Sequence, residues 1–108
     1  LHIVGLYSDG GVHSHAEHLH LLIERCVEDF AGPIVLHLIT DGRDTAPRSA
    51  AGFVRDLAEK IAPHPRVRIG SVSGRFFAMD RDKRWERVEK AYAVFAGTAP
   101  KPDSPDPV

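Results

Sequence analysis

Three polar clusters in this sequence combine residue types that bind and process anions. They span residues 8–15, 40–44 and 73–85, and they contain arginines, carboxylates, a histidine and glycines. An arginine offers a planar fork of N–H donors to a carboxylate or phosphate. A carboxylate can accept and return the proton of a hydroxyl group. Together these groups suit a small, multiply anionic, hydroxylated ligand such as a sugar-acid phosphate.

Each cluster directly follows a short apolar run, and this position predicts where the cluster lies. The runs are Leu1–Tyr7, Ile34–Ile39 and Val67–Val72. If they form parallel strands, all three clusters fall at the carboxyl ends of one sheet, where open α/β sheets bind ligands. Ile34–Ile39 is nearly all apolar, which is typical of a central strand covered on both faces.

Amphipathic segments alternate with these runs and predict helices. Apolar residues recur every three or four positions from about Ser14 to Asp29, and Gly32 and Pro33 end that segment. A second helix is expected to begin near Pro47 and to end near Pro63.

A third helix is expected from Trp85 to Phe95. Its spacing places Trp85 in the core, and Asp82 is a candidate N-cap. Lys83 and Arg87 are expected on a solvated face.

Strands that alternate with helices indicate an α/β fold with right-handed crossovers. The prediction is a three-layer αβα arrangement with a parallel sheet of three βα units. Residues 1–97 would form this partial domain. Residues 98–108 contain four prolines and are expected to be a disordered tail. Residue 1 already lies in a strand-like run, so the sequence is expected to be a piece of a longer domain.

The bulk composition excludes several classes of partner. The chain has 108 residues, of which 43% are hydrophobic and 27% charged, with a net charge of -1. This charge gives no electrostatic basis for nucleic-acid binding. No apolar stretch approaches the length of a membrane span, and no signal-peptide pattern is present. A single cysteine, Cys26, fits a reducing compartment and predicts a cytoplasmic location.

The first cluster offers His13 as a contact for a phosphoryl group, since it precedes the helix at the sheet edge. The alternative is a simple turn capped by Asp9. The four histidines between residues 13 and 20 could suggest a metal site. His15 and His18 share a helix face, but His20 points away and no thiolate is near, so no metal ligand is predicted.

The second cluster offers Arg43 as an anion fork and Asp44 as a proton-transfer group. The alternative is a tight turn with an exposed ion pair of little energetic weight. In the third cluster, Arg75 and Arg81 flank an apolar stretch that could exclude water from a ligand. The alternative there is the mixed-charge start of a solvated helix.

Taken together, the clusters resemble one family, the cofactor-independent phosphoglycerate mutases, which do not need 2,3-bisphosphoglycerate. The resemblance rests on the motif from Gly5 to His15, on Thr40-Asp41-Gly42-Arg43-Asp44-Thr45 with Pro47, and on the motif from Ser73 to Tyr92. Three such motifs in order are far more specific than any one of them.

The resemblance implies an α/β phosphotransferase domain that is inserted into a phosphatase domain with two manganese ions and a serine nucleophile. The parent would interconvert 3-phosphoglycerate and 2-phosphoglycerate in glycolysis and gluconeogenesis through a phosphoserine intermediate. This chain would be an incomplete phosphotransferase domain, inactive alone and without a cofactor of its own. It could self-associate through an exposed strand edge. The segment after residue 98 is expected to depart from the family.

The resemblance also implies roles for individual side chains. His13 would lie beside the transferred phosphoryl group, and Asp44 would exchange protons with the substrate hydroxyls. The other substrate-binding residues would be Arg43, Arg75 and Arg81. Two further readings remain open: a non-catalytic module that binds small phosphorylated acids, and a flavodoxin-like regulatory domain. The latter predicts no convergence of arginines at the sheet edge.

Overall fold

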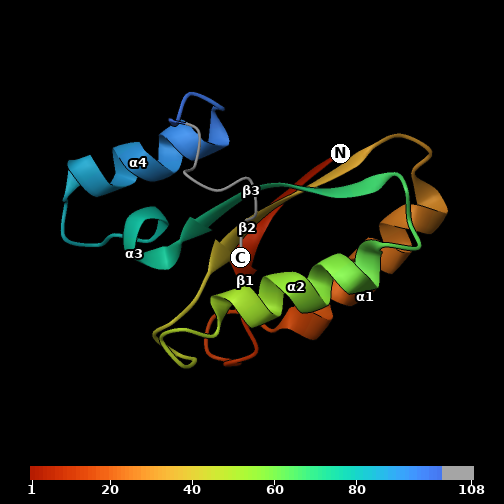
Figure 1. Cartoon of the computed structure of the whole chain (residues 1–108), viewed down its shortest axis with the longest axis horizontal. Helices are drawn as coiled ribbons and strands as arrows, with labels where there is room; N and C mark the ends of the chain where they lie inside the picture. Colours follow the sequence, from red (N-terminus) through yellow and green to blue (C-terminus); the bar gives the residue numbers. More distant parts are fainter. Residues whose placement is uncertain (101–108) are drawn as a thin grey trace.

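The computed structural model describes residues 1–100 and places a parallel sheet between two helical layers (Figure 1). The strands are β1 (His2–Tyr7), β2 (Ile34–Thr40) and β3 (Val67–Gly74), and their order in the sheet is β1-β2-β3. The central position of β2 agrees with its apolar sequence. The predicted three-layer α/β fold is confirmed.

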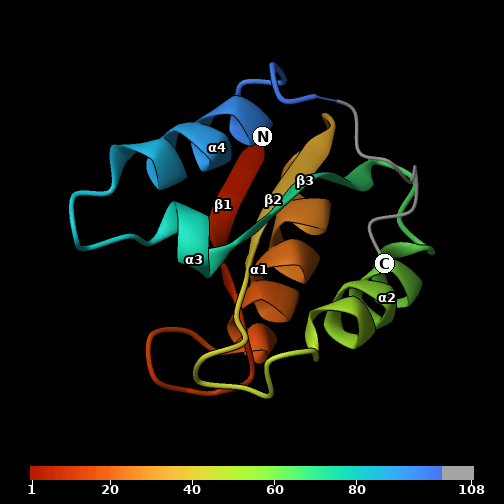
Figure 2. The ribbon, with the colours of Figure 1, turned by 60° about the vertical axis from the view of Figure 1, so that its left-hand side comes forward.

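Helices α1 (Ala16–Asp29) and α2 (Ala50–Ile61) cover one face of the sheet (Figure 2). Both lie on the same face because the strand order advances in one direction and each crossover is right-handed. The core lies between these helices and the sheet, where Ile34, Leu36 and Leu57 are fully buried.

The opposite face carries α3 (Arg75–Ala78) and α4 (Trp85–Phe95), which pack against each other and against β3 (Figures 1 and 2). The short helix α3 was not predicted. Trp85 is 71% exposed, so its predicted place in the core is wrong. It begins α4, and the residues of that helix that face the sheet come later in the sequence.

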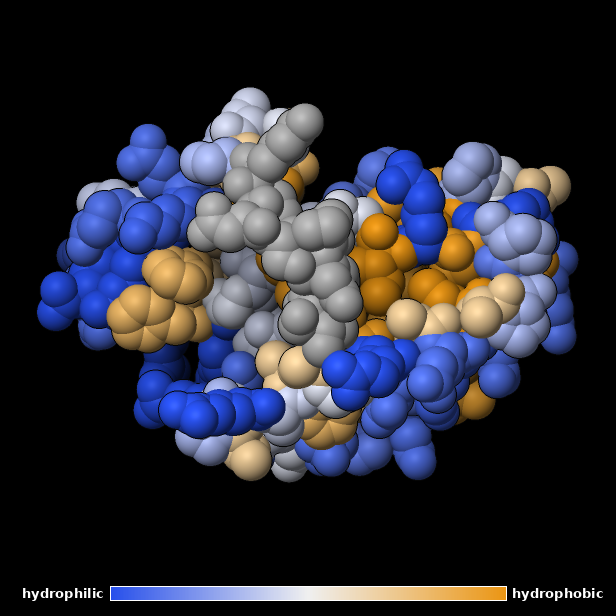
Figure 3. All heavy atoms as spheres, viewed as in Figure 1, coloured by the Kyte–Doolittle hydropathy of each residue, from blue (hydrophilic) through white to orange (hydrophobic). Residues whose placement is uncertain are grey.

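Both outer strands leave one edge of the described sheet unpaired. Val4 on β1 is 59% exposed, and Figure 3 shows apolar residues at the surface between β3 and α2. No helix within residues 1–100 has the length and apolar character needed to cross a membrane. Residues 98–108 were expected to be disordered. Residues 101–108 of this segment lie outside the described part of the chain, so that expectation stays a prediction.

A single irregularity sets how the strand ends line up. Ile34 pairs with Val67, but beyond Leu36 the register shifts by one residue, and Thr40 pairs with Gly74. The extra residue is Gly70, where an added Cβ would clash with Val35 Cγ1. Glycine is therefore required at this bulge.

Candidate functional site

The strand register places one residue of each cluster side by side. Tyr7 pairs with Thr40, and Thr40 pairs with Gly74. The next residue along each strand is therefore Ser8, Asp41 or Arg75. Without the bulge at Gly70, the third cluster would be out of step with the other two by one residue.

Asp41 joins the other two residues, Ser8 and Arg75, through its carboxylate. Ser8 Oγ donates to Asp41 Oδ2 over 2.6 Å, and Arg75 Nη1 donates to Oδ1 over 3.0 Å. The backbone amides of Arg43 and Asp44 also donate to Oδ1, over 2.9 and 3.0 Å. The side chain of Asp41 is 1% exposed. A buried carboxylate thus receives four hydrogen bonds and fixes the loop that carries Arg43 and Asp44.

These contacts keep Asp41 ionised. Burial by itself would raise the pKa of the Asp41 carboxyl, but its four hydrogen bonds, that from Ser8 foremost, hold it well below the usual value. The hydrogen bond to Asp44, followed by that to Asp41, raises the pKa of Arg75. Sequence reasoning assigned Asp41 no role, because its importance depends on the strand register.

Asp44 lies between a cation and a histidine. Its Oδ2 accepts from Arg75 Nη1 over 2.7 Å and lies 3.9 Å from His13 Nε2. Gly10 permits this arrangement, because a Cβ there would stand 2.9 Å from the backbone oxygen of Asp44. The glycine therefore brings the first loop against the second loop.

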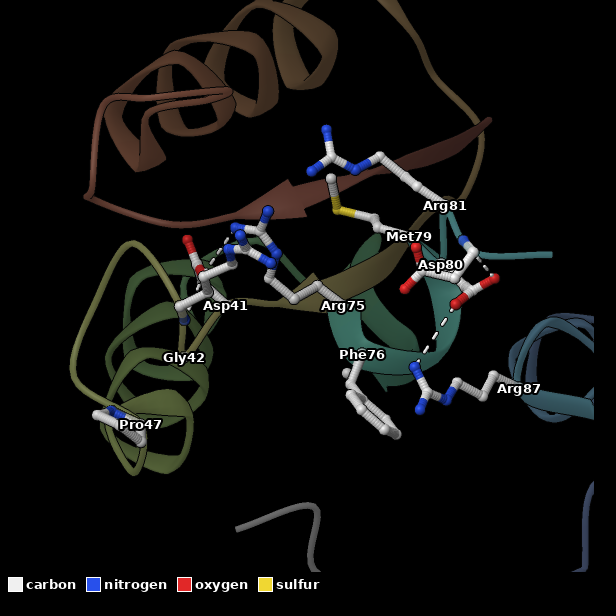
Figure 4. A pocket seen from close by; sticks show the side chains of 12 residues that line it. Asp41, Gly42, Pro47, Arg75, Phe76, Met79, Asp80, Arg81 and Arg87 are labelled. Carbon is white, nitrogen blue, oxygen red and sulfur yellow. Dashed lines mark hydrogen bonds and ion pairs between the residues drawn. The ribbon is translucent and has the colours of Figure 1, made fainter. Parts of the chain in front are cut away.

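A cavity of about 560 Å³ opens beside this network. Its lining includes four arginines and three aspartates, namely Arg43, Arg75, Arg81, Arg87, Asp41, Asp80 and Asp82. Arg75 and Arg81 lie on the two sides of Met79, and Arg87 lies on the far side of Asp80 (Figure 4). The lining carries a surplus of one positive charge, which favours an anion.

The arginines differ in how far they are already engaged. Within residues 1–100, the side chains of Arg43 and Arg81 take part in no hydrogen bond or ion pair. Arg75 uses Nη1 for both aspartates, so its other N–H groups remain for a ligand. Phe76 and Met79 add apolar wall to the same cavity.

The structure brings together three of the five expected site residues in this cavity: Arg43, Arg75 and Arg81. Asp44 joins them through Arg75, and His13, 3.9 Å from Asp44, lines a separate groove beside β1 and α1. This convergence at the sheet edge is contrary to the flavodoxin-like reading.

Arg87 is only 26% exposed and faces the cavity, so its predicted place on a solvated face is wrong. Its guanidinium lies 3.9 Å from the centroid of the Phe76 ring. Asp82 does not cap α4; instead Asp80 Oδ2 accepts from the amides of Asp82 and Arg84. Phe76 lies in α3, a helix that the sequence did not predict, and Asp80 follows that helix by two residues. Both contacts therefore depend on α3.

His20 contacts the core, because its Nε2 lies 2.9 Å from the hydroxyl of Tyr7. Burial, followed by Lys60, lowers the pKa of His20. Within residues 1–100, no three His, Cys, Asp or Glu side chains form a group that could hold a metal ion.

Comparisons with known proteins show what this chain is similar to. The model of the family described as "BPG-independent PGAM N-terminus" matches residues 1–107. The match extends into the proline-rich segment, so the expectation that this segment departs from the family is wrong.

The 2,3-bisphosphoglycerate-independent phosphoglycerate mutase of Laribacter hongkongensis is 54% identical over 94 residues, which are 87% of this chain and 18% of that protein. The protein of the same name from Legionella pneumophila strain Paris is 48% identical over 106 residues, covering 98% of this chain and 21% of its own length. A crystal structure of Leishmania mexicana phosphoglycerate mutase superposes with a TM-score of 0.77 and 38% identity, covering 85% of this chain and 18% of that one. The chain thus spans about a fifth of the length of the curated relatives it matches.

Proposed function

This chain belongs to the 2,3-bisphosphoglycerate-independent phosphoglycerate mutases, and we propose that residues 1–97 are the part of the phosphotransferase domain that grips 2- and 3-phosphoglycerate. The observation that supports this most strongly is the presence of Arg43, Arg75 and Arg81 around one cavity. A phosphoglycerate carries a phosphate of about −1.5 to −2 charges and a carboxylate, and several converging guanidinium groups match that charge.

The proposed roles follow from how each side chain is held. Arg75 is fixed by Asp41 and Asp44, so it offers a rigid set of N–H donors. Arg43 and Arg81, which line the cavity from the loops after β2 and after α3, hold the remaining anionic oxygens. His13, half-exposed beside Asp44, would contact the phosphoryl group that is transferred.

Asp44 is the proposed proton acceptor for the C2 and C3 hydroxyls of the glycerate. Its Oδ2 reaches Arg75 on one side and faces His13 on the other, and its side chain is 17% exposed. A substrate hydroxyl can therefore approach it from the open side. The proton would move from the hydroxyl to the carboxylate and return after phosphoryl transfer.

The complete reaction requires parts that the described residues do not supply. Two manganese ions and a serine nucleophile are implied by the family, and the described side chains offer no group for such ions. In the proposal they belong to another domain of a longer cytoplasmic protein that acts in glycolysis and gluconeogenesis. The chain alone is expected to show no conversion of 3- to 2-phosphoglycerate, with or without manganese.

The open strand edges support a further part of the proposal. Exposed edges of β1 and β3 offer unpaired backbone groups that pair readily with another strand. The isolated chain would therefore self-associate through one of them, and sedimentation at several concentrations measures this.

Calorimetric titration of the 108-residue chain tests ligand binding. We expect 3- and 2-phosphoglycerate to bind more tightly than glycerate or inorganic phosphate, and Arg81→Gln to weaken binding of both. Equal affinity for phosphoglycerate and inorganic phosphate would contradict a site built for two anionic groups.

A second assay separates the mutase from the non-catalytic module. Asp44→Asn in the longer protein should reduce turnover by about 10²–10⁴-fold and leave KM nearly unchanged. A longer protein that binds phosphoglycerate but has no mutase activity in its unsubstituted form would favour the binding module.

A further inference from the structure

A second buried carboxylate, Asp80, lies on the rim of the cavity opposite Asp41 (Figure 4). Its side chain is 2% exposed. Its Oδ1 is the one buried side-chain oxygen or nitrogen within residues 1–100 that has no hydrogen-bond partner. A carboxyl oxygen in such a position requires an explanation, because buried polar atoms are nearly always paired.

The other oxygen of Asp80 shapes the loop that carries Arg81. Oδ2 accepts from the amide of Asp82 over 3.2 Å and from the amide of Arg84 over 2.8 Å. The chain between them curls around this oxygen, and Lys83 takes a φ of 58°. Arg81 is the residue enclosed between Asp80 and its first amide donor, so its backbone direction depends on Asp80.

Arg87 stands next to the unpartnered oxygen. Its Nη1 lies 3.5 Å from Oδ1, which is longer than a hydrogen bond. The guanidinium also stacks over Phe76. A small shift of Arg87 toward Asp80 would pair Oδ1, so this side of the cavity can tighten in a way that the Asp41 side cannot.

We propose that Asp80 is a positioning residue, which directs Arg81 at the anion in the cavity and holds Arg87 on the adjacent wall. This inference rests on the proposed function, since it assumes that the anion is phosphoglycerate. Asp80 itself does not touch the ligand. Its Oδ2 acts on Arg81 through the loop amides. Its Oδ1 acts on Arg87 through the ion pair.

The test is a double-mutant cycle in the 108-residue chain, with 3-phosphoglycerate as the probe. Asp80→Ala should raise Kd about tenfold in the wild-type background and have a clearly smaller effect in an Arg81→Ala background, because coupled residues are not additive and only the contact with Arg87 is then left to lose. Asp80→Asn retains an acceptor for the loop amides, so it should recover most of the lost affinity. Glu86→Gln removes one negative charge at the exposed start of α4 and serves as the matched control.

A second readout uses only the wild-type chain. Saturating 3-phosphoglycerate should slow hydrogen exchange at the amides of Asp82 and Arg84, because a loop held through Arg81 opens less often. Unchanged exchange at both amides, or equal losses from Asp80→Ala in the two backgrounds, would overturn the inference and leave the proposed function intact. Failure of the wild-type chain to bind 3-phosphoglycerate would overturn the proposed function, and the inference with it.

Discussion

Two buried aspartates line one cavity, yet they are satisfied to very different degrees. Asp41 and Asp80 have side chains that are 1% and 2% exposed. Asp41 receives four hydrogen bonds, from a hydroxyl, two amides and a guanidinium. Asp80 receives two, both on Oδ2, and its Oδ1 receives none.

The difference follows from where the two residues lie in the fold. Asp41 comes directly after β2, where the strand register aligns it with Ser8 and Arg75. Asp80 belongs to the loop between α3 and α4, outside the sheet. One wall of the cavity is therefore fixed by strand pairing, whereas the other is held by a short loop between two helices.

The largest expected effect comes from comparing Asp41→Asn with Asp80→Asn. Asp41→Asn removes a charged acceptor of four hydrogen bonds, and loss of a hydrogen bond to a charged group costs about 1.5–3 kcal/mol. Asp80→Asn should cost about 1 kcal/mol, because Oδ1 of Asp80 accepts no hydrogen bond and its ion pair with Arg87 is long, at 3.5 Å. Urea unfolding of the two variants measures both. Equal losses would mean that the two carboxylates contribute alike.

Lowering the pH tests the contribution of Asp41 without a mutation, because acid protonates its carboxylate. The pKa of Asp41 is lower in the folded state than its unfolded value of about 3.9. Its contribution to stability is therefore complete above that pH and is lost as pH falls toward the folded-state value.

Two histidines make the stability of the fold depend on pH in a higher range than Asp41 does. Burial first, then a neighbouring cation or histidine, lowers the pKa of both His20 and His37. Stability should thus begin to fall below about pH 6.5 and fall further below about pH 3.9. Denaturant melting across this range should show that Asp41→Asn keeps the first loss and lacks the second. A second loss of wild-type size in Asp41→Asn would assign it to another group.

Gly70→Ala tests whether the bulge aligns the Asp41 side. The added methyl group would press on Val35, which is 5% exposed, and overpacking of this kind costs about 1–3 kcal/mol. Amide shifts should change around Asp41 and Arg75 and stay the same in residues 80–84. Gly5→Ala is the matched control, because a Cβ at Gly5 meets no atom within 4 Å.

Phe76→Leu should have the smallest effect. It removes the ring under the Arg87 guanidinium at a site where Phe76 is 59% exposed, and such contacts contribute about 0.5–1 kcal/mol. Urea unfolding should register this loss, and the Asp41 network should be unaffected. A loss as large as that of Asp41→Asn would show that the Asp80 side is as rigid as the Asp41 side.

Much of the fold could be predicted from local patterns in the sequence. The three apolar runs became β1, β2 and β3, and the apolar character of Ile34–Ile39 indicated its central place. The carboxyl-end position of the clusters followed from the parallel direction of the strands, because each cluster directly follows its apolar run. Helix starts were less exact: α2 begins at Ala50, three residues after Pro47.

What could not be predicted depends on contacts between distant residues. The partners of Asp41 are set by a register shift at Gly70, which no local pattern reveals. Asp80, Arg87 and Trp85 were misjudged or overlooked because helical spacing from 85 to 95 gave no sign of the α3 turn before it. The roles of the five expected site residues stay predictions until a ligand is placed.

A crystal structure of the 108-residue chain with 3-phosphoglycerate tests the central claim most directly. We expect the anionic groups of the ligand within about 3.2 Å of the side-chain nitrogens of Arg75 and Arg81, with the Asp41 network unchanged. Ligand density at another place, such as the groove of β1 and α1 lined by His13 and His18, with none between the arginines, would contradict the account.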